Sequence, residues 1–236
     1  MLAFQGSQQN KDFYLARVRA HYVADEIIHG QYWENGKGCA VGCTIHGSHH
    51  ADYETALGIP QVLARLEDRI FEGLDNGESK EFPGQFLSAI RPGADLTSVA
   101  DKFFYWLLGG GQVGEFIFTN ERARAAVIGV QKLFDRRFAG EVVTLEEWRA
   151  ARAAAYAADA ADAAATYAAA YAADAADDAD AADDAYVAAA AYAAAAAAAY
   201  AADAAAAYAA TYAADASRRK AYSTMKTKLL QLLAEA

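Results

Sequence analysis

The sequence predicts an all-α protein, in which a compact multi-helix N-terminal part packs on a long alanine-rich helical hairpin or bundle. Apolar residues recur at helical rather than alternating spacing through most of the first 140 residues. No glycine or proline follows Gly140, and 44 of the 66 residues from 151 to 216 are alanine, the strongest intrinsic helix former. We therefore expect a helical domain at 1–140 and an alanine-rich segment at 141–236, packed together as one unit.

The first helices follow from apolar spacing and from the residues that end them. A helix is expected over 11–28 with Gly30 as its C-cap, and a short one over 51–57 that stops before Pro60. The next helix is the clearest in the chain, because its apolar residues recur every three or four positions. The apolar face holds Ile59, Leu63, Leu66, Ile70 and Leu74, and the other face holds Arg65, Glu67, Asp68, Arg69 and Glu72.

Turn signals divide the rest of the N-terminal part. Asn76-Gly77 and Pro83-Gly84 are expected to interrupt the chain, and helices are expected over 85–90, 96–108 and, capped by Thr119 or Asn120, up to Phe138. Residues 116–118 are the most strand-like run. Thr144 and Glu147 have the spacing of a capping box, in which each side chain accepts a hydrogen bond from the other residue's backbone amide.

The alanine-rich segment is expected to be helical and to fold back on itself. A straight rod from Thr144 to the C-terminus would be roughly 140 Å long at about 1.5 Å per residue. The acidic patch at 174–185 is the favoured bend, because like charges one turn apart oppose a continuous helix. These helices could also join copies of the chain into a homo-oligomer, a question that the sequence leaves open. Near the C-terminus the expected core residues are Tyr222, Met225, Leu229, Leu230, Leu232 and Leu233.

Charge and composition narrow the function classes. The formal net charge of −10 argues against nucleic acid as a partner, because phosphate binding requires a basic surface. The N-terminal residues lack the pattern of a signal peptide, and the longest uncharged run, 185–202, is nearly all alanine and tyrosine and too weakly apolar for a membrane span. We expect a cytoplasmic protein without a membrane partner, in which the two cysteines stay reduced.

Residues 36–50, GKGCAVGCTIHGSHH, contain both cysteines and three of the five histidines, and are the candidate site. In a purely structural interpretation the glycines permit tight turns and the cysteines are small buried groups. In an enzymatic one, Cys39 or Cys43 is a nucleophile with His46 or His49 as its base. The spacing C-x3-C-x2-H-x2-H is too compressed for a standard zinc finger, so no metal or other cofactor is expected, and zinc remains an alternative.

Four features of the sequence are similar to those of other proteins: the segments YLARVRAHYVADEI, YWENGKGCAVGCTIH and LGIPQVLARLEDRIFEGL, and the long Ala/Tyr/Asp tail that follows them. Together they resemble a family of hypothetical proteins found in bacterial and phage genomes, over nearly the whole chain. The resemblance implies an accessory protein of a mobile element with a role in phage–host conflict, such as sequestering a nucleotide signal. It implies no fold, catalytic residue or ligand set.

The expected function is binding of a small anionic molecule, such as a nucleotide, in a pocket around residues 39–50. Cationic side chains would hold its charge, histidines and a threonine would hydrogen-bond, and aromatic rings would stack. The residues assigned to this pocket are Arg17, Arg19, Tyr32, Trp33, Lys37, Thr44, His46, His50, Tyr53 and Arg65. A thiol-dependent hydrolase or transferase is the first alternative, and a structural or inhibitory protein-interaction module is the second.

Overall fold

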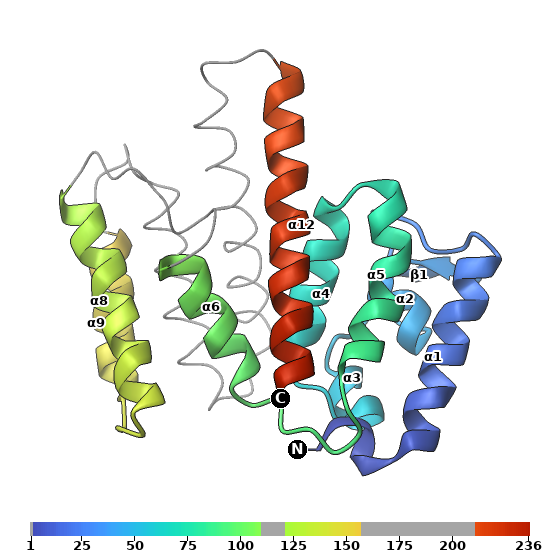
Figure 1. Ribbon diagram of the computed structural model, residues 1–236, viewed down its shortest axis with the longest axis horizontal. Coiled ribbons are helices and arrows are strands. Elements are labelled where there is room, and N and C mark those ends of the chain that lie inside the picture. Colours follow the sequence, from blue (N-terminus) through green and yellow to red (C-terminus); the bar gives the residue numbers. More distant parts are fainter. Residues whose placement is uncertain (1, 110–120, 157–210) are drawn as a thin grey trace. The chain divides into compact units, whose positions relative to one another are not determined.

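The computed structural model describes residues 2–109, 121–156 and 211–236 (Figure 1). The all-α class is confirmed, because the described elements are helices apart from two strands of two residues each. The chain divides into two compact units, one made of residues 1–100 and 222–236 and the other of residues 101–221. This grouping differs from the division at residue 140 that composition suggested, and the latter stays a prediction.

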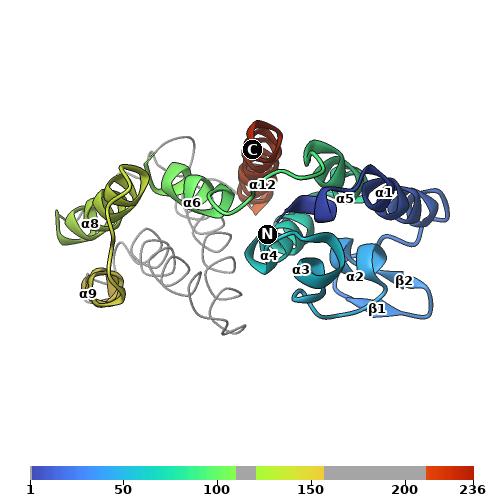
Figure 2. The same ribbon diagram turned by 90° about the horizontal axis from the view of Figure 1, so that it is seen from below.

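The first unit holds a short 3₁₀-helix, a small hairpin and five α-helices, closed by the end of a sixth. Its elements are η1 (Ala3–Gly6), α1 (Gln8–Val23), β1 (Trp33–Glu34), β2 (Lys37–Gly38), α2 (Ala40–Ile45), α3 (Asp52–Leu57), α4 (Gln61–Gly73) and α5 (Asn76–Ala89). Strands β1 and β2 pair antiparallel and lie beside α2 (Figure 2). Helix α1 packs along α5, and α4 and α5 both contribute fully buried apolar side chains to the core.

Helix α1 ends five residues before the sequence predicted. It begins after Ser7, whose hydroxyl accepts a hydrogen bond from the Asn10 amide, and it stops at Val23. Ile27 pairs with Gly38 through a parallel bridge, so the chain is extended where the prediction had helix. The expected Gly30 C-cap is therefore wrong. Pairing of this extended segment with β2 outweighs the local helical pattern, because it satisfies backbone groups and buries Ile27.

Helix α5 begins at the first turn signal, Asn76-Gly77, and runs through the second, Pro83-Gly84, which was expected to break the chain. Asp75 caps its N-terminus by accepting from the Gly77 and Glu78 amides, and Pro83 lies inside the helix. The prediction of a helix restricted to 85–90 is thus wrong. Phe82, Phe86 and Leu87 are fully buried along this helix, and their packing offsets the hydrogen bond that proline removes.

The last turns of α12 (Thr211–Glu235) complete the first unit, and they lie against α4 and α5 (Figure 1). The Tyr222 ring covers Gly73 so closely that a Cβ there would overlap it. Lys226 donates a 2.6 Å hydrogen bond to Glu78 of α5. The expected core residues of this segment are buried except Leu230, which is half-buried.

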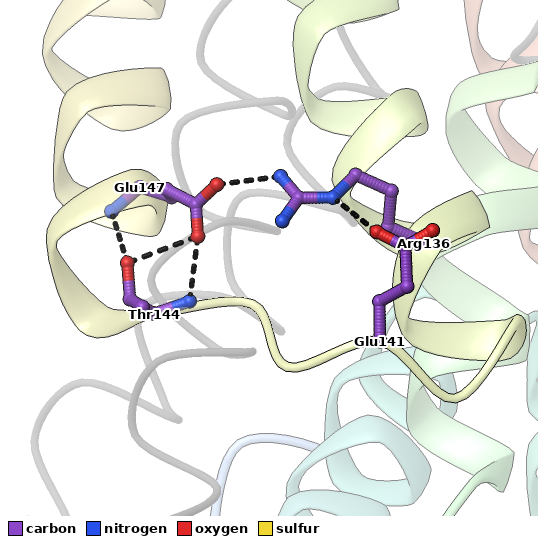
Figure 3. A network of polar contacts seen from close by, with 4 residues as sticks. All are labelled: Arg136, Glu141, Thr144 and Glu147. Carbon is purple, nitrogen blue, oxygen red and sulfur yellow. Dashed lines mark hydrogen bonds and ion pairs between the residues drawn. The ribbon is translucent and has the colours of Figure 1, made fainter.

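The second unit contains residues 101–109 of α6 (Val99–Gly109), α8 (Glu121–Phe138) and α9 (Leu145–Tyr156). Gly140 has a positive φ of 80° and follows α8, as the sequence predicted. The capping box is confirmed: the Glu147 amide donates to the Thr144 hydroxyl over 3.3 Å, and the Thr144 amide donates to the Glu147 carboxylate over 2.8 Å (Figure 3). Arg136 of α8 pairs with the same carboxylate at 2.5 Å.

Some expectations fall on residues 110–120 and 157–210, outside the described part of the chain. They are the strand-like run at 116–118, the bend at 174–185 and any oligomer contact through the alanine-rich helices. Among the helices that the structure does describe, none has the length and apolarity to cross a membrane.

Candidate functional site

The glycines of residues 36–50 have a steric purpose. The segment forms β2 and α2, and the preceding chain crosses directly over both. A Cβ atom at Gly38 or Gly42 would overlap the carbonyl oxygen of Tyr32. The glycine spacing of the motif therefore allows the backbone before β1 to lie on the start of α2.

Both thiols are sealed inside the first unit. Cys39 is 1 % exposed and Cys43 is fully buried, with its Sγ donating to the Gly38 carbonyl over 3.3 Å. Burial raises the pKa of Cys43 to about 12. The pKa of Cys39 is also raised well above its usual range, first by burial and then by the Asp68 carboxylate. A thiolate nucleophile at neutral pH requires the opposite shift, so this geometry argues against the thiol-dependent enzyme.

Thr44 and Tyr53 of the expected pocket are also fully buried, and their polar atoms bind protein groups. The Thr44 hydroxyl donates to the Ala40 carbonyl over 2.8 Å, and the Tyr53 hydroxyl donates to Glu67 over 2.7 Å. Glu67 itself is fully buried, although it lies on the polar face of the predicted helix. A ligand in solvent reaches neither Thr44 nor Tyr53, and these side chains stabilise the core.

His50 and Tyr32 contact a second carboxylate in the same region, that of Asp68. His50 Nε2 lies 3.3 Å from Asp68 Oδ2, and the Tyr32 ring meets the His50 ring edge to face. The pKa of Tyr32 is raised to about 12, first by partial burial and next by Asp68. Arg65, on α4 with Asp68, is half-buried. The pattern had suggested that these groups bind ligand, whereas His50 and Tyr32 contact Asp68 and each other.

The remaining predicted residues lie on the outer surface of the loop or on α1. Arg17 donates to the Thr44 carbonyl over 3.0 Å and so contacts the C-terminal end of α2. Trp33 and His46 stack with ring centroids 4.4 Å apart. Lys37 and His49 are exposed. No three histidine, cysteine or acidic side chains among the described residues are arranged to hold a metal ion.

A cleft lies instead on the opposite side of α1, between α1 and α5. Its volume is about 660 Å³, within the usual range of about 300–1,000 Å³ for small-molecule sites. The α1 wall offers apolar and aromatic surface, and the α5 wall is mostly polar. The lining residues are Leu15, Ala16, Val18, Arg19, Tyr22, Lys80, Glu81, Gly84, Gln85 and Ser88.

Arg19 is the single residue of the expected pocket that lines this cleft. Its guanidinium has no hydrogen bond or ion pair to any residue in the described ranges. Lys80 pairs with Asp25, which is largely exposed, and Gln85 donates to Glu81 over 3.2 Å. A Cβ atom at Gly84 would meet nothing within 4 Å, so the floor of the cleft is open there. Sequence patterns did not indicate α5 as a wall of the cleft, because its helix was predicted to begin at residue 85 and the helix begins at Asn76.

Comparisons of the chain with protein-family models, with curated proteins and with solved structures found no match. The resemblance to hypothetical bacterial and phage proteins therefore stays a prediction.

Proposed function

We propose that this protein binds a small anionic molecule in the cleft between α1 and α5. The observation that carries the proposal is Arg19, a guanidinium that lines the cleft without a partner among the described residues. Charged side chains in proteins are usually paired or hydrated, and a phosphate or carboxylate accepts two parallel hydrogen bonds from such a group. The proposal keeps the class of function that the sequence predicted, but the site is the cleft between α1 and α5 instead of a pocket around residues 39–50.

The other lining residues suit an anion with an apolar or flat part. Lys80 adds a second cation, and its exposed pair with Asp25 is of the kind that contributes little free energy, so an anion can compete for the lysine. Leu15, Val18 and the Tyr22 ring offer apolar surface beside these charges. A nucleotide fits this description, with its phosphates on Arg19 and Lys80 and its base against Tyr22. Sequestering such a molecule in the cytoplasm is the role that the sequence resemblance implies.

Isothermal titration calorimetry with inorganic pyrophosphate, AMP and ATP tests the proposal. Arg19→Gln should weaken binding by about tenfold or more, since hydrogen bonds to a charged group contribute about 1.5–3 kcal/mol. Arg91→Gln is the matched control, because Arg91 is an exposed arginine outside the cleft. Gly84→Trp should fill the open floor and abolish binding, whereas Gly84→Ala should leave it unchanged.

Two results would contradict the proposal. One is a wild-type protein that binds none of the three probes. The other is an Arg19→Gln variant that binds as tightly as Arg91→Gln while Gly84→Trp stays folded and binds normally. Circular dichroism of each variant separates a loss of binding from a loss of fold.

The two alternative functions, a thiol-dependent enzyme and a structural or inhibitory protein-interaction module, depend on different parts of the chain. The buried thiols give the hydrolase or transferase no accessible nucleophile. The structural or inhibitory module depends on the alanine-rich segment, most of which is outside the described residues, and it stays a prediction.

A further inference from the structure

Two histidines outside the cleft face each other in the first unit. His21 of α1 and His46, the C-cap of α2, have their Nε2 atoms 2.8 Å apart. The other ring nitrogen of His21, Nδ1, lies 2.7 Å from the Glu26 carboxylate. Because a carboxylate accepts only, His21 Nδ1 carries a proton, and the chain of contacts runs from Glu26 through His21 to His46.

The two imidazoles meet head-on. Their ring centroids are 5.0 Å apart, close to the largest separation that a 2.8 Å distance between the nitrogens allows. A metal ion forms bonds of about 2.0–2.1 Å to imidazole nitrogen, so an ion does not fit between two nitrogens in this arrangement. A hydrogen bond does fit, and it requires one Nε2 to carry a proton and the other to carry none.

Trp33 links this pair to the hairpin. Its ring stacks on His46 with 11° between the planes, and it meets His21 edge to face at 5.3 Å. His46 has a φ of 54°, a left-handed conformation that costs free energy for a residue with a side chain, so surrounding contacts must hold it. The pair and Trp33 together hold α1, the end of α2 and β1 in one place.

We propose that His21, His46 and Trp33 form a pH-sensitive latch. The latch is closed while the two imidazoles share a hydrogen bond, and it opens when protonation makes both facing nitrogens donors. Two imidazolium rings at this distance repel each other and lose their hydrogen bond, which removes this link between α1 and the end of α2, while the Arg17 hydrogen bond to the Thr44 carbonyl remains.

The charged groups around the His21–His46 pair determine whether the protein becomes more or less stable as the pH falls. His46 faces His21 and Arg17 of α1, both cationic or able to become so, and Trp33 of β1, which does not titrate. Glu26, in the loop after α1, pairs with His21 through its carboxylate and also lies near the Cys43 thiol. The pKa of His46 is lowered, first by burial and then by Arg17 and His21. The unfolded chain therefore binds the proton on this residue more readily than the folded chain, and stability falls as the pH drops below about 6.5.

The test compares urea unfolding of the full chain between pH 8 and pH 5 in wild type, His46→Asn and His49→Asn. Asparagine tolerates the left-handed conformation at residue 46 and does not titrate. The exposed His49 is the matched control, three residues away. The ratio of the wild-type to the His46→Asn unfolding constant should rise as the pH falls, by at most tenfold per pH unit, which is the limit for one proton. His49→Asn should follow the wild-type curve.

A ratio that stays constant from pH 8 to pH 5 would overturn the latch, as would an equal effect of His49→Asn. Long-range ¹H–¹⁵N spectra of the wild-type imidazoles give a second measurement that needs no variant. They should show a hydrogen-bonded His21–His46 pair at pH 8 and loss of this pairing, with a shift of the Trp33 indole signal, on acidification. Independent protonation of the two rings without a change at Trp33 would refute the proposal.

Discussion

Replacing Glu67 by glutamine tests whether burial keeps the Glu67 carboxyl group protonated in the folded protein. The Glu67 side chain is fully buried, one oxygen accepts from Tyr53 over 2.7 Å, and the other oxygen has no hydrogen-bond partner among the described residues. Its pKa is raised well above its ordinary value of 4.5, first by burial and then by Asp68, against the opposing effect of the Tyr53 hydrogen bond. The folded state therefore keeps a proton on Glu67 at pH values where the unfolded chain has lost it.

The sign and the size of the effect follow from proton linkage. Between pH 4.5 and the folded-state pKa the folded protein binds one proton more than the unfolded chain, so stability falls as the pH rises. One proton gives a slope of at most about 1.4 kcal/mol per pH unit. Glutamine has nearly the same shape and does not titrate, so Glu67→Gln removes this slope.

Urea unfolding from pH 5 to pH 8 measures the effect, because every other titrating group cancels in the difference between variant and wild type. The stability of Glu67→Gln relative to wild type should increase with pH, by at most about 4 kcal/mol over this range. Glu34→Gln, a change on the exposed hairpin, should leave the difference flat. A flat or falling difference for Glu67→Gln would refute the conclusion that burial keeps this carboxyl protonated.

The other predictions concern glycines, thiols and the capping box. Gly42→Ala should prevent stable folding, measured by thermal unfolding, because its Cβ would overlap the Tyr32 carbonyl, whereas Gly84→Ala should raise stability by about 0.4–1 kcal/mol. Iodoacetamide should label Cys39 and Cys43 only after denaturation, and mass-spectrometric detection of rapid labelling in the native protein would contradict their burial. The pKa of Glu147 is lowered to about 2, so its contribution to α9 should be present above pH 4.5 and disappear toward pH 2, and helical circular dichroism that is equally acid-sensitive in Glu147→Gln would contradict this.

Features that depend on neighbours along the chain could be predicted from the sequence. The apolar stripe of α4 and the capping box of Thr144 and Glu147 are examples, and both are confirmed. Each rests on residues three or four positions apart, which meet whenever a helix forms. The all-α class follows from the same kind of local pattern.

Features that depend on distant parts of the chain were missed. Glu67 lies on the polar side of a helical projection, yet Tyr53 of α3 covers it. The Pro83-Gly84 pair indicates a turn, yet burial of Phe82 and Phe86 holds α5 together through it. The cysteine and histidine stretch looked like one site, whereas in the structure its thiols are buried, His50 contacts the Asp68 carboxylate and His46 pairs with His21 of α1.

The sequence by itself determined the class of fold, the centre of most helices and the presence of an unusual glycine, cysteine and histidine segment. Tertiary structure alone decided which of these side chains solvent reaches, where α1 and α5 end, and that a cleft with Arg19 lies between them. The physical reason is that helix formation is governed by residues within one or two turns, whereas burial, pKa and cavity shape depend on what the rest of the chain places against each residue.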